Sequence, residues 1–255
     1  MPAPVALPRL SWGAASAGRR ALLIHGLGSN GALMWRYGAA LADAGWRADA
    51  VDLRGHGTAP RTLDYTLDSY AADVAATRPD AGAGAGIWDL VIGHSLGGAA
   101  SVLAAAADPS WTRRLVLIDP ALALTDHDRD IVRDSQTRSF DDPSQAAVRA
   151  EHPDWHPQDI ELKALSAQQA SRWAVEQTSA QNPDWDVTDA ALQVAVPTHV
   201  IASDPGVYSI FRGKPAEAAV APNPHFSVSV VADAGHSPHR DRPEATIEAL
   251  FAVLA

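Results

Sequence analysis

The sequence contains no cysteine among its 255 residues. This absence excludes a disulfide framework, a thiolate metal site and a cysteine nucleophile. It is compatible with a reducing compartment, and we expect a cytoplasmic protein. Long hydrophobic runs are also absent, because no window approaches the roughly 18 apolar residues that span a membrane. The first residues lack the basic start and the apolar stretch of a signal peptide.

Positive charge is scarce: 20 Lys and Arg face 30 Asp and Glu, giving a net charge of −10. Such a surface repels nucleic acid phosphates and anionic lipid, so we expect a small-molecule substrate rather than either partner. Cofactor and metal motifs are absent too, including the P-loop, G-x-G-x-x-G and H-E-x-x-H. His152 and His156 are four residues apart, but Pro153 disrupts the helix that would align them. We therefore expect neither a cofactor nor a metal ion.

What the sequence does contain is a 47% hydrophobic, 20% charged composition, which is typical of a globular chain that buries its own core. Short apolar runs alternate with longer amphipathic segments, the pattern of βα units and a mostly parallel sheet flanked by helices. The expected strands are 21–24, 46–51, 88–92, 115–118, 198–202 and 226–231. The expected helices are 33–44, 67–77, 96–107, 159–164, 167–178 and 243–254, with a flexible Gly/Ala-rich connector at 80–86.

The strand rhythm stops after the strand that ends at Asp119. Residues 121–188 contain charges, prolines and three tryptophans but no convincing strand. We interpret them as a helical insertion into an α/β core formed by residues 1–120 and 189–255. The charge run at 126–130 is interpreted as a solvated face.

The strongest chemical signal is Gly93-His94-Ser95-Leu96-Gly97, a G-x-S-x-G motif. A predicted strand runs directly into it and a predicted helix runs directly out of it, which is the context of a nucleophile elbow. Glycines flank the serine because larger side chains would clash with the neighbouring strand and helix. The structural alternative to a nucleophile is a glycine-rich helix start in which Ser95 serves only as the N-cap. The context favours Ser95 as a nucleophile.

Three further segments accompany this motif in the sequence, two before it and one after it. They are His25-Gly26-Leu27-Gly28-Ser29, Asp52-Leu53-Arg54-Gly55-His56-Gly57 and Gly235-His236. Together with the elbow they resemble the α/β-hydrolase family over nearly the whole chain. The resemblance implies that the insertion forms a lid over the site. The elbow carries serine, which departs from the dehalogenase and epoxide hydrolase branches with their aspartate nucleophile.

The base and the acid follow from the order serine, acid, histidine in this fold. His236 comes directly after the last expected strand and is the predicted base, ahead of His239 and of His225, which precedes that strand. Asp204 follows the strand at 198–202 and is the predicted acid. Asp119, after the strand at 115–118, is the alternative, since some relatives place the acid there.

The oxyanion hole is expected at two backbone amides. The residue after the nucleophile, Leu96, supplies one, and the resemblance gives the other to Leu27, with His25 bracing that loop. Candidate pocket residues are Gly26, Gly28, Trp35, His94, Trp155, Trp173 and Trp185. The insertion tryptophans could equally fasten the insertion to the core.

These residues predict a serine hydrolase that cleaves a carboxylic ester, thioester or lactone without a cofactor. Two alternatives stay open. The same triad could serve other chemistry, as in C–C bond hydrolases, hydroxynitrile lyases or cofactor-free peroxidases. The scaffold could also be a ligand-binding receptor, although a pure binder need not keep all three catalytic groups.

Overall fold

A computed structural model describes residues 2–80 and 86–255. Within them, seven strands form one sheet in the order β1-β3-β2-β4-β5-β6-β7. β1 is antiparallel to β3 and all other pairs are parallel. The strands are β1 (Arg9–Trp12), β2 (Arg19–Ile24), β3 (Trp46–Val51), β4 (Leu90–His94), β5 (Leu115–Ile118), β6 (Thr198–Ala202) and β7 (Phe226–Val230).

This sheet confirms the predicted α/β class and its mostly parallel strands. β1 was not predicted, because it is a short edge strand whose first two residues, Arg9 and Leu10, are exposed and give no apolar run. Residues 81–85 of the predicted connector lie outside the described residues.

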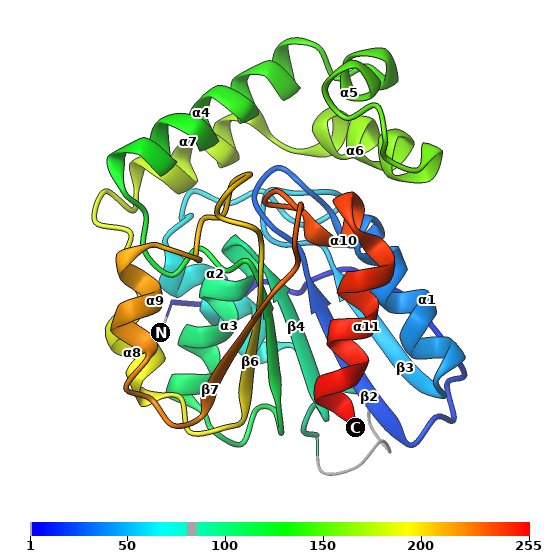
Figure 1. Cartoon of the computed structure of the whole chain (residues 1–255), viewed down its shortest axis with the longest axis vertical. Helices are drawn as coiled ribbons and strands as arrows, with labels where there is room; N and C mark the ends of the chain where they lie inside the picture. The colour runs from blue at the N-terminus through cyan, green and yellow to red at the C-terminus, as the bar shows by residue number, and fades with distance from the viewer. Residues whose placement is uncertain (1, 81–85) are drawn as a thin grey trace.

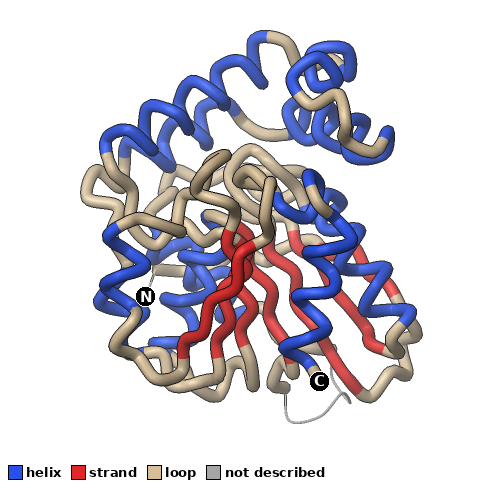
Figure 2. Tube along the Cα trace, in the orientation of Figure 1, coloured by secondary structure: helices blue, strands red, loops and turns tan. Residues whose placement is uncertain are grey.

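Helices cover both faces of the sheet (Figures 1 and 2). Alternate residues of β2 show why: Leu22 and Ile24 join one buried cluster, whereas Ala21 and Leu23 join the other. The first cluster contains residues of α2 (Leu67–Ala76), α3 (Leu96–Ala107) and α8 (Thr188–Gln193). The second contains residues of α1 (Trp35–Asp43) and α11 (Pro243–Leu254). A sheet buried on both faces explains the near-continuous apolar strands in the sequence.

The segment between β5 and β6 is helical. Its first four helices, α4 (Asp126–Asp141), α5 (Gln145–Glu151), α6 (Pro157–Gln169) and α7 (Arg172–Ala180), lie beyond the carboxyl ends of the parallel strands (Figure 1). The two helices predicted here, 159–164 and 167–178, correspond to α6 and α7. The helix α6 is longer than predicted and includes residues 167–169, whereas α7 begins later, at Arg172. The remaining short elements of the core are η1 (Gly31–Met34), α9 (Pro215–Val220) and α10 (Pro238–Asp241).

The charge run at 126–130 is not simply a solvated face. It opens α4 with a capping box between Thr125 and Asp128. Asp128 is fully buried and binds Lys214 Nζ at 2.8 Å. The helix was overlooked because its exposed face carries many charges and gives no clear apolar stripe.

The two ends of the helical segment are joined side by side. Leu124 N donates to Trp185 O at 3.0 Å and Val187 N donates to Leu122 O at 2.7 Å. Ala123 forms an antiparallel bridge with Asp186 between these bonds. We call residues 121–124 with 185–187 the stalk. In the part of the chain that the structure describes, no helix is both long and apolar enough to cross a membrane.

Candidate active site

Ser95 stands at the sharp turn between β4 and α3. Its backbone has φ +53° and ψ −116°, a strained conformation for a residue with a side chain. A Cβ on Gly97 would lie 2.5 Å from Ile24 O, and one on Gly93 would lie 2.6 Å from Gly97 O. Only glycine therefore allows the turn to sit this close to the sheet. The turn presents the Ser95 hydroxyl at the carboxyl edge of the strands.

His236 lies in the loop after β7 and reaches the serine. Its Nε2 is 3.0 Å from Ser95 Oγ, and its Nδ1 is 2.7 Å from Asp119 Oδ2. The buried His94 donates from Nε2 to the backbone oxygen of His236 at 2.8 Å and so holds that loop. Burial lowers the pKa of His94 well below its usual value, so this neighbour stays neutral.

The predicted acid is wrong. The carboxylate beside His236 belongs to Asp119, the alternative, which follows β5 and is fully buried. Asp204 instead accepts Gly206 N at 2.8 Å and Asp233 N at 2.9 Å, so its side chain stabilises a turn. Both aspartates follow strand ends at the same sheet edge, and chain order alone favoured the wrong one.

The Asp119 carboxylate is fixed by four donors. Besides His236, they are the amides of Ser203 (3.2 Å) and Ile210 (3.0 Å) and the hydroxyl of Ser209. The backbone of Asp119 has φ +36°. Among the described non-glycine residues only Ser95, Asp119 and Asp233 have a positive φ, so the strain coincides with the site.

The loop at 25–29 lies directly against the nucleophile. A Cβ on Gly26 would stand 2.9 Å from Ser95 Cβ. Neither Leu27 N nor Leu96 N donates a hydrogen bond within the described residues. Both amides, which were predicted to form the oxyanion hole, are therefore available to donate hydrogen bonds to a substrate oxygen.

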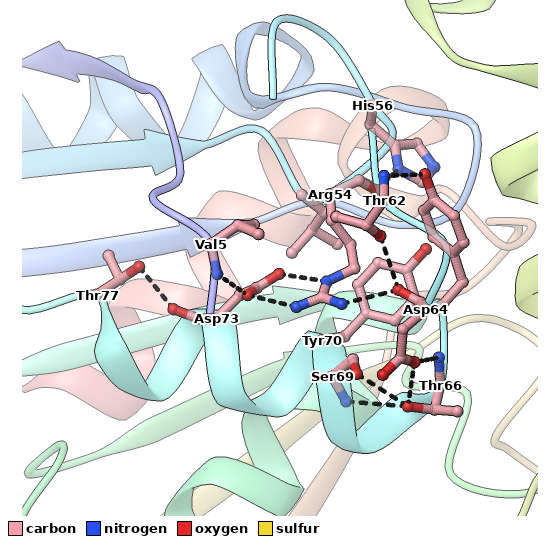
Figure 3. A network of polar contacts seen from close by, with 12 residues as sticks. Val5, Arg54, His56, Thr62, Asp64, Thr66, Ser69, Tyr70, Asp73 and Thr77 are labelled. Carbon is pink, nitrogen blue, oxygen red and sulfur yellow. Dashed lines mark hydrogen bonds and ion pairs between the residues drawn. The ribbon is translucent and has the colours of Figure 1, made fainter. Parts of the chain in front are cut away.

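A buried ion pair anchors the neighbouring loop at 52–57. Arg54 binds both carboxylate oxygens of Asp73, at 2.6 and 2.7 Å, and donates to Asp64 O at 2.8 Å (Figure 3). Asp73 also accepts Val5 N at 2.7 Å. The anchored loop carries His56, whose Nε2 accepts Gly28 N at 3.0 Å. The network therefore supports the loop at 25–29 through His56.

A cavity of about 570 Å³ opens above Ser95, between the sheet-edge loops and helices α4 and α6. Of the predicted pocket residues, Gly26, His94 and Trp155 line it, as do Leu27, Ser95 and His236. Trp155 is buried, stacks on His152 with ring centroids 3.7 Å apart, and donates to Asp241 at 2.6 Å.

The other four pocket candidates lie elsewhere, and their prediction is wrong. Gly28 is not among the lining residues, and a Cβ on it would collide with the side chain of Gln136. Trp35 donates to Asp159 of α6 at 2.8 Å and so joins the helical segment to the core. Trp185 donates to Ala121 O at 2.7 Å within the stalk and is buried in the first core cluster. Trp173 is 45% exposed and meets Tyr65 edge-on. Tryptophan composition could not separate these roles.

Most of the lining residues were not predicted, among them Tyr208, Lys163 and Arg240. Arg240 follows His236 by four residues and lies in the short helix α10, so its proximity to His236 could be predicted from their spacing. Lys163 is one of two lysines in the chain, but it is remote in sequence and no motif marks it. Only the folding of α6 over the sheet brings it to Ser95.

Comparison with known proteins agrees with this geometry. A family model described as "Alpha/beta hydrolase family" matches residues 21–249. The chain belongs to the alpha/beta hydrolase family. Lipase LipV of Mycobacterium tuberculosis is 34% identical over 149 residues, which are 58% of this chain and 55% of the lipase. 2-(Acetamidomethylene)succinate hydrolase of Mesorhizobium japonicum is 37% identical over 99 residues, 38% of this chain and 34% of that one.

These matches thus span about half or less of the relatives' own length. Similar solved structures, in contrast, cover almost the whole of this chain. The N-formylmaleamic acid deformylase of Pseudomonas putida S16 superposes with a TM-score of 0.79 at 23% identity, covering 96% of each chain. At this identity the likeness shows the alpha/beta hydrolase fold alone.

Proposed function

We propose that this protein is a serine hydrolase that cleaves a carboxylic ester, thioester or lactone. The observation that carries the proposal is the hydrogen-bonded series from Ser95 to His236 to Asp119, with distances of 3.0 and 2.7 Å, at the base of a cavity. This is the arrangement of nucleophile, base and orienting acid that acyl transfer uses. The partial relative named lipase supports an ester substrate.

The steps follow from the atoms that are in contact. Ser95 Oγ attacks the substrate carbonyl carbon while His236 Nε2 takes its proton. Asp119 keeps the proton of His236 on Nδ1 and stabilises the imidazolium that forms. The amides of Leu27 and Leu96 donate to the oxyanion. The tetrahedral intermediate collapses, and His236 gives its proton to the leaving group. Water then attacks the acyl-enzyme by the same route.

A Ser95→Ala variant tests the proposal. Wild type and variant are incubated with a fluorophosphonate probe and assayed with 4-nitrophenyl butyrate, a butyryl thioester and γ-butyrolactone. Ser110→Ala, at an exposed serine outside the cavity lining, is the matched control. We expect the wild type and the control to be labelled and to turn over at least one of these substrates. Ser95→Ala should lose labelling and about 10⁵- to 10⁶-fold of the turnover.

The opposite results are equally clear. Wild-type protein that is neither labelled nor active would refute an assembled triad and favour the ligand-binding alternative. Labelling without turnover of any acyl substrate would refute ester chemistry and favour other reactions on the same triad.

A further inference from the structure

Two cationic side chains from different elements face the cavity above Ser95. Lys163 comes from α6 and Arg240 from α10, and both line the cavity. Arg240 is only 6% exposed. Arg240 is buried and Lys163 is partly buried, whereas the other lining Lys or Arg residues, Arg138 and Arg242, are exposed.

These two cations have few partners. Among the described residues, Lys163 Nζ makes one hydrogen bond, to Gly28 O at 3.0 Å. Arg240 makes one, from Nη1 to Ser237 Oγ at 3.2 Å, and its Nε is buried without a partner. No carboxylate among these residues lies within 4.0 Å of either cation. An ammonium offers three donors and a guanidinium five, so most remain available.

The acidic residues that line the cavity do not form an ion pair with either cation. Asp241 accepts Trp155 Nε1 at 2.6 Å and Gly235 N at 2.8 Å. Glu151 is exposed and pairs with Arg138 at 3.1 Å. Asp154 and Asp233 are exposed. These carboxylates are therefore held by other groups or solvated. Asp241, and Asp159, which is bound to Arg36, attract Arg240 without bonding to it.

Burial of cations without counter-ions is unfavourable, and both groups respond to it. Desolvation, followed by the charge of Arg240, lowers the pKa of Lys163 to about 8. Desolvation also lowers the pKa of Arg240. A bound anion would offset this cost, since it supplies oxygens that accept the free N–H groups.

We propose that Lys163 and Arg240 form a carboxylate-binding subsite, so that the preferred substrate is an acyl compound with a second, free carboxylate. The inference rests on the proposed acyl-transfer function. Arg240 also lies over the Trp155 ring, 5.2 Å from its centroid. This contact holds the guanidinium in place. The free carboxylate can belong to the acyl part or to the leaving group, and both contain the same anionic oxygens.

Matched ester pairs test the subsite. Mono-4-nitrophenyl adipate is compared with its neutral methyl ester, which places the carboxylate on the acyl side. 4-Acetoxybenzoate is compared with methyl 4-acetoxybenzoate, which places it on the leaving group. Spontaneous hydrolysis is subtracted. We expect kcat/KM to favour the anionic member of at least one pair by about tenfold or more, mainly through KM.

Variants of the two cations test whether they cause the preference for the anionic ester. Lys163→Met and Arg240→Gln should each reduce the anionic-to-neutral ratio to about threefold or less, while Arg240→Lys, which keeps the charge, should retain part of it. Arg149→Gln removes an exposed charge outside the cavity lining and should leave the ratio unchanged. Because each ratio is measured on one protein sample, partial unfolding of a variant cancels.

Either of two outcomes overturns the subsite. One is a wild-type enzyme that labels at Ser95 and hydrolyses the neutral esters but does not prefer an anionic one. The other is an anionic preference that survives in both Lys163→Met and Arg240→Gln. If the wild type is neither labelled nor active on any of the four esters, the proposed function fails first, and the subsite fails with it.

Discussion

His25 and His56 each accept a backbone N–H from the other's loop. His25 Nε2 accepts Leu53 N, and His56 Nε2 accepts Gly28 N, both at 3.0 Å. Their Nδ1 atoms donate to the carbonyls of Gly26 and Arg54. Each ring is thus both donor and acceptor, which only a neutral imidazole can be. The pair locks the loop at 25–29 to the loop at 52–57, and the predicted bracing role of His25 is confirmed.

This pair predicts a loss of stability in mild acid. Burial lowers the pKa of His56 to about 3, against about 6.5 in the unfolded chain. As the pH falls below 6.5, the unfolded chain takes up a proton that the folded protein does not. The free energy of unfolding should then fall by up to about 1.4 kcal/mol per pH unit for this group.

Urea unfolding at pH 7.5 and pH 5 measures the effect. His56→Gln should lower the free energy of unfolding at pH 7.5 by about 1–3 kcal/mol, because Gly28 N loses its partner. It should also flatten the pH dependence relative to the wild type. His225→Gln, at an exposed position, serves as the control. A pH dependence that is the same in His56→Gln and wild type would contradict a neutral buried His56.

Replacing the acid separates the two aspartates. Asp119→Asn should lower kcat by about 10³- to 10⁴-fold, because His236 loses the charge that fixes its tautomer and stabilises its cation. Asp204→Asn should change kcat by less than about twofold, since Asp204 stabilises only a turn. Hydrolysis of 4-nitrophenyl butyrate by both variants gives the comparison. Inactivation by Asp204→Asn with an active Asp119→Asn would reverse the assignment.

The Arg54–Asp73 pair makes a prediction about stability. Both side chains are almost fully buried, so removing one leaves the other charge without a partner. Arg54→Met and Asp73→Leu should each lower the free energy of unfolding by about 3–5 kcal/mol. The double variant should lose at least about 2 kcal/mol less than the sum of the two. Urea denaturation of the four proteins measures the coupling, and strictly additive losses would refute it.

Lys163 gives the proposed subsite a pH dependence. With a pKa of about 8, its ammonium is charged at pH 7 and loses the charge as the pH rises further. The anionic-to-neutral ratio of kcat/KM should therefore fall between pH 7 and pH 9.5. His236 affects both esters alike and cancels in the ratio. In Lys163→Arg the charge persists and the ratio should stay level over this range. A level ratio in the wild type would remove Lys163 from the subsite.

The sequence predicted those features that local chemistry determines. The apolar runs of the buried strands and the glycines around Ser95 arise from sterics within a few residues, and the strand-to-helix turn followed directly. The choice between Asp119 and Asp204 depends instead on which strand end faces His236, a three-dimensional relationship. The edge strand at Arg9–Trp12 and the charged helix α4 were missed because neither shows a periodic apolar pattern. Lys163 required the placement of α6.

The stalk has a practical consequence for protein engineering. It begins two residues after Asp119. Its two segments are hydrogen-bonded to each other, Leu124 to Trp185 and Val187 to Leu122. The segment 125–184 therefore leaves the core and returns to it at adjacent points of the chain. A foreign helical segment, or a short turn, could be grafted there with little loop-closure penalty. The chain therefore offers a splice point at which the helices that line the cavity can be exchanged while the residues around Ser95 are kept.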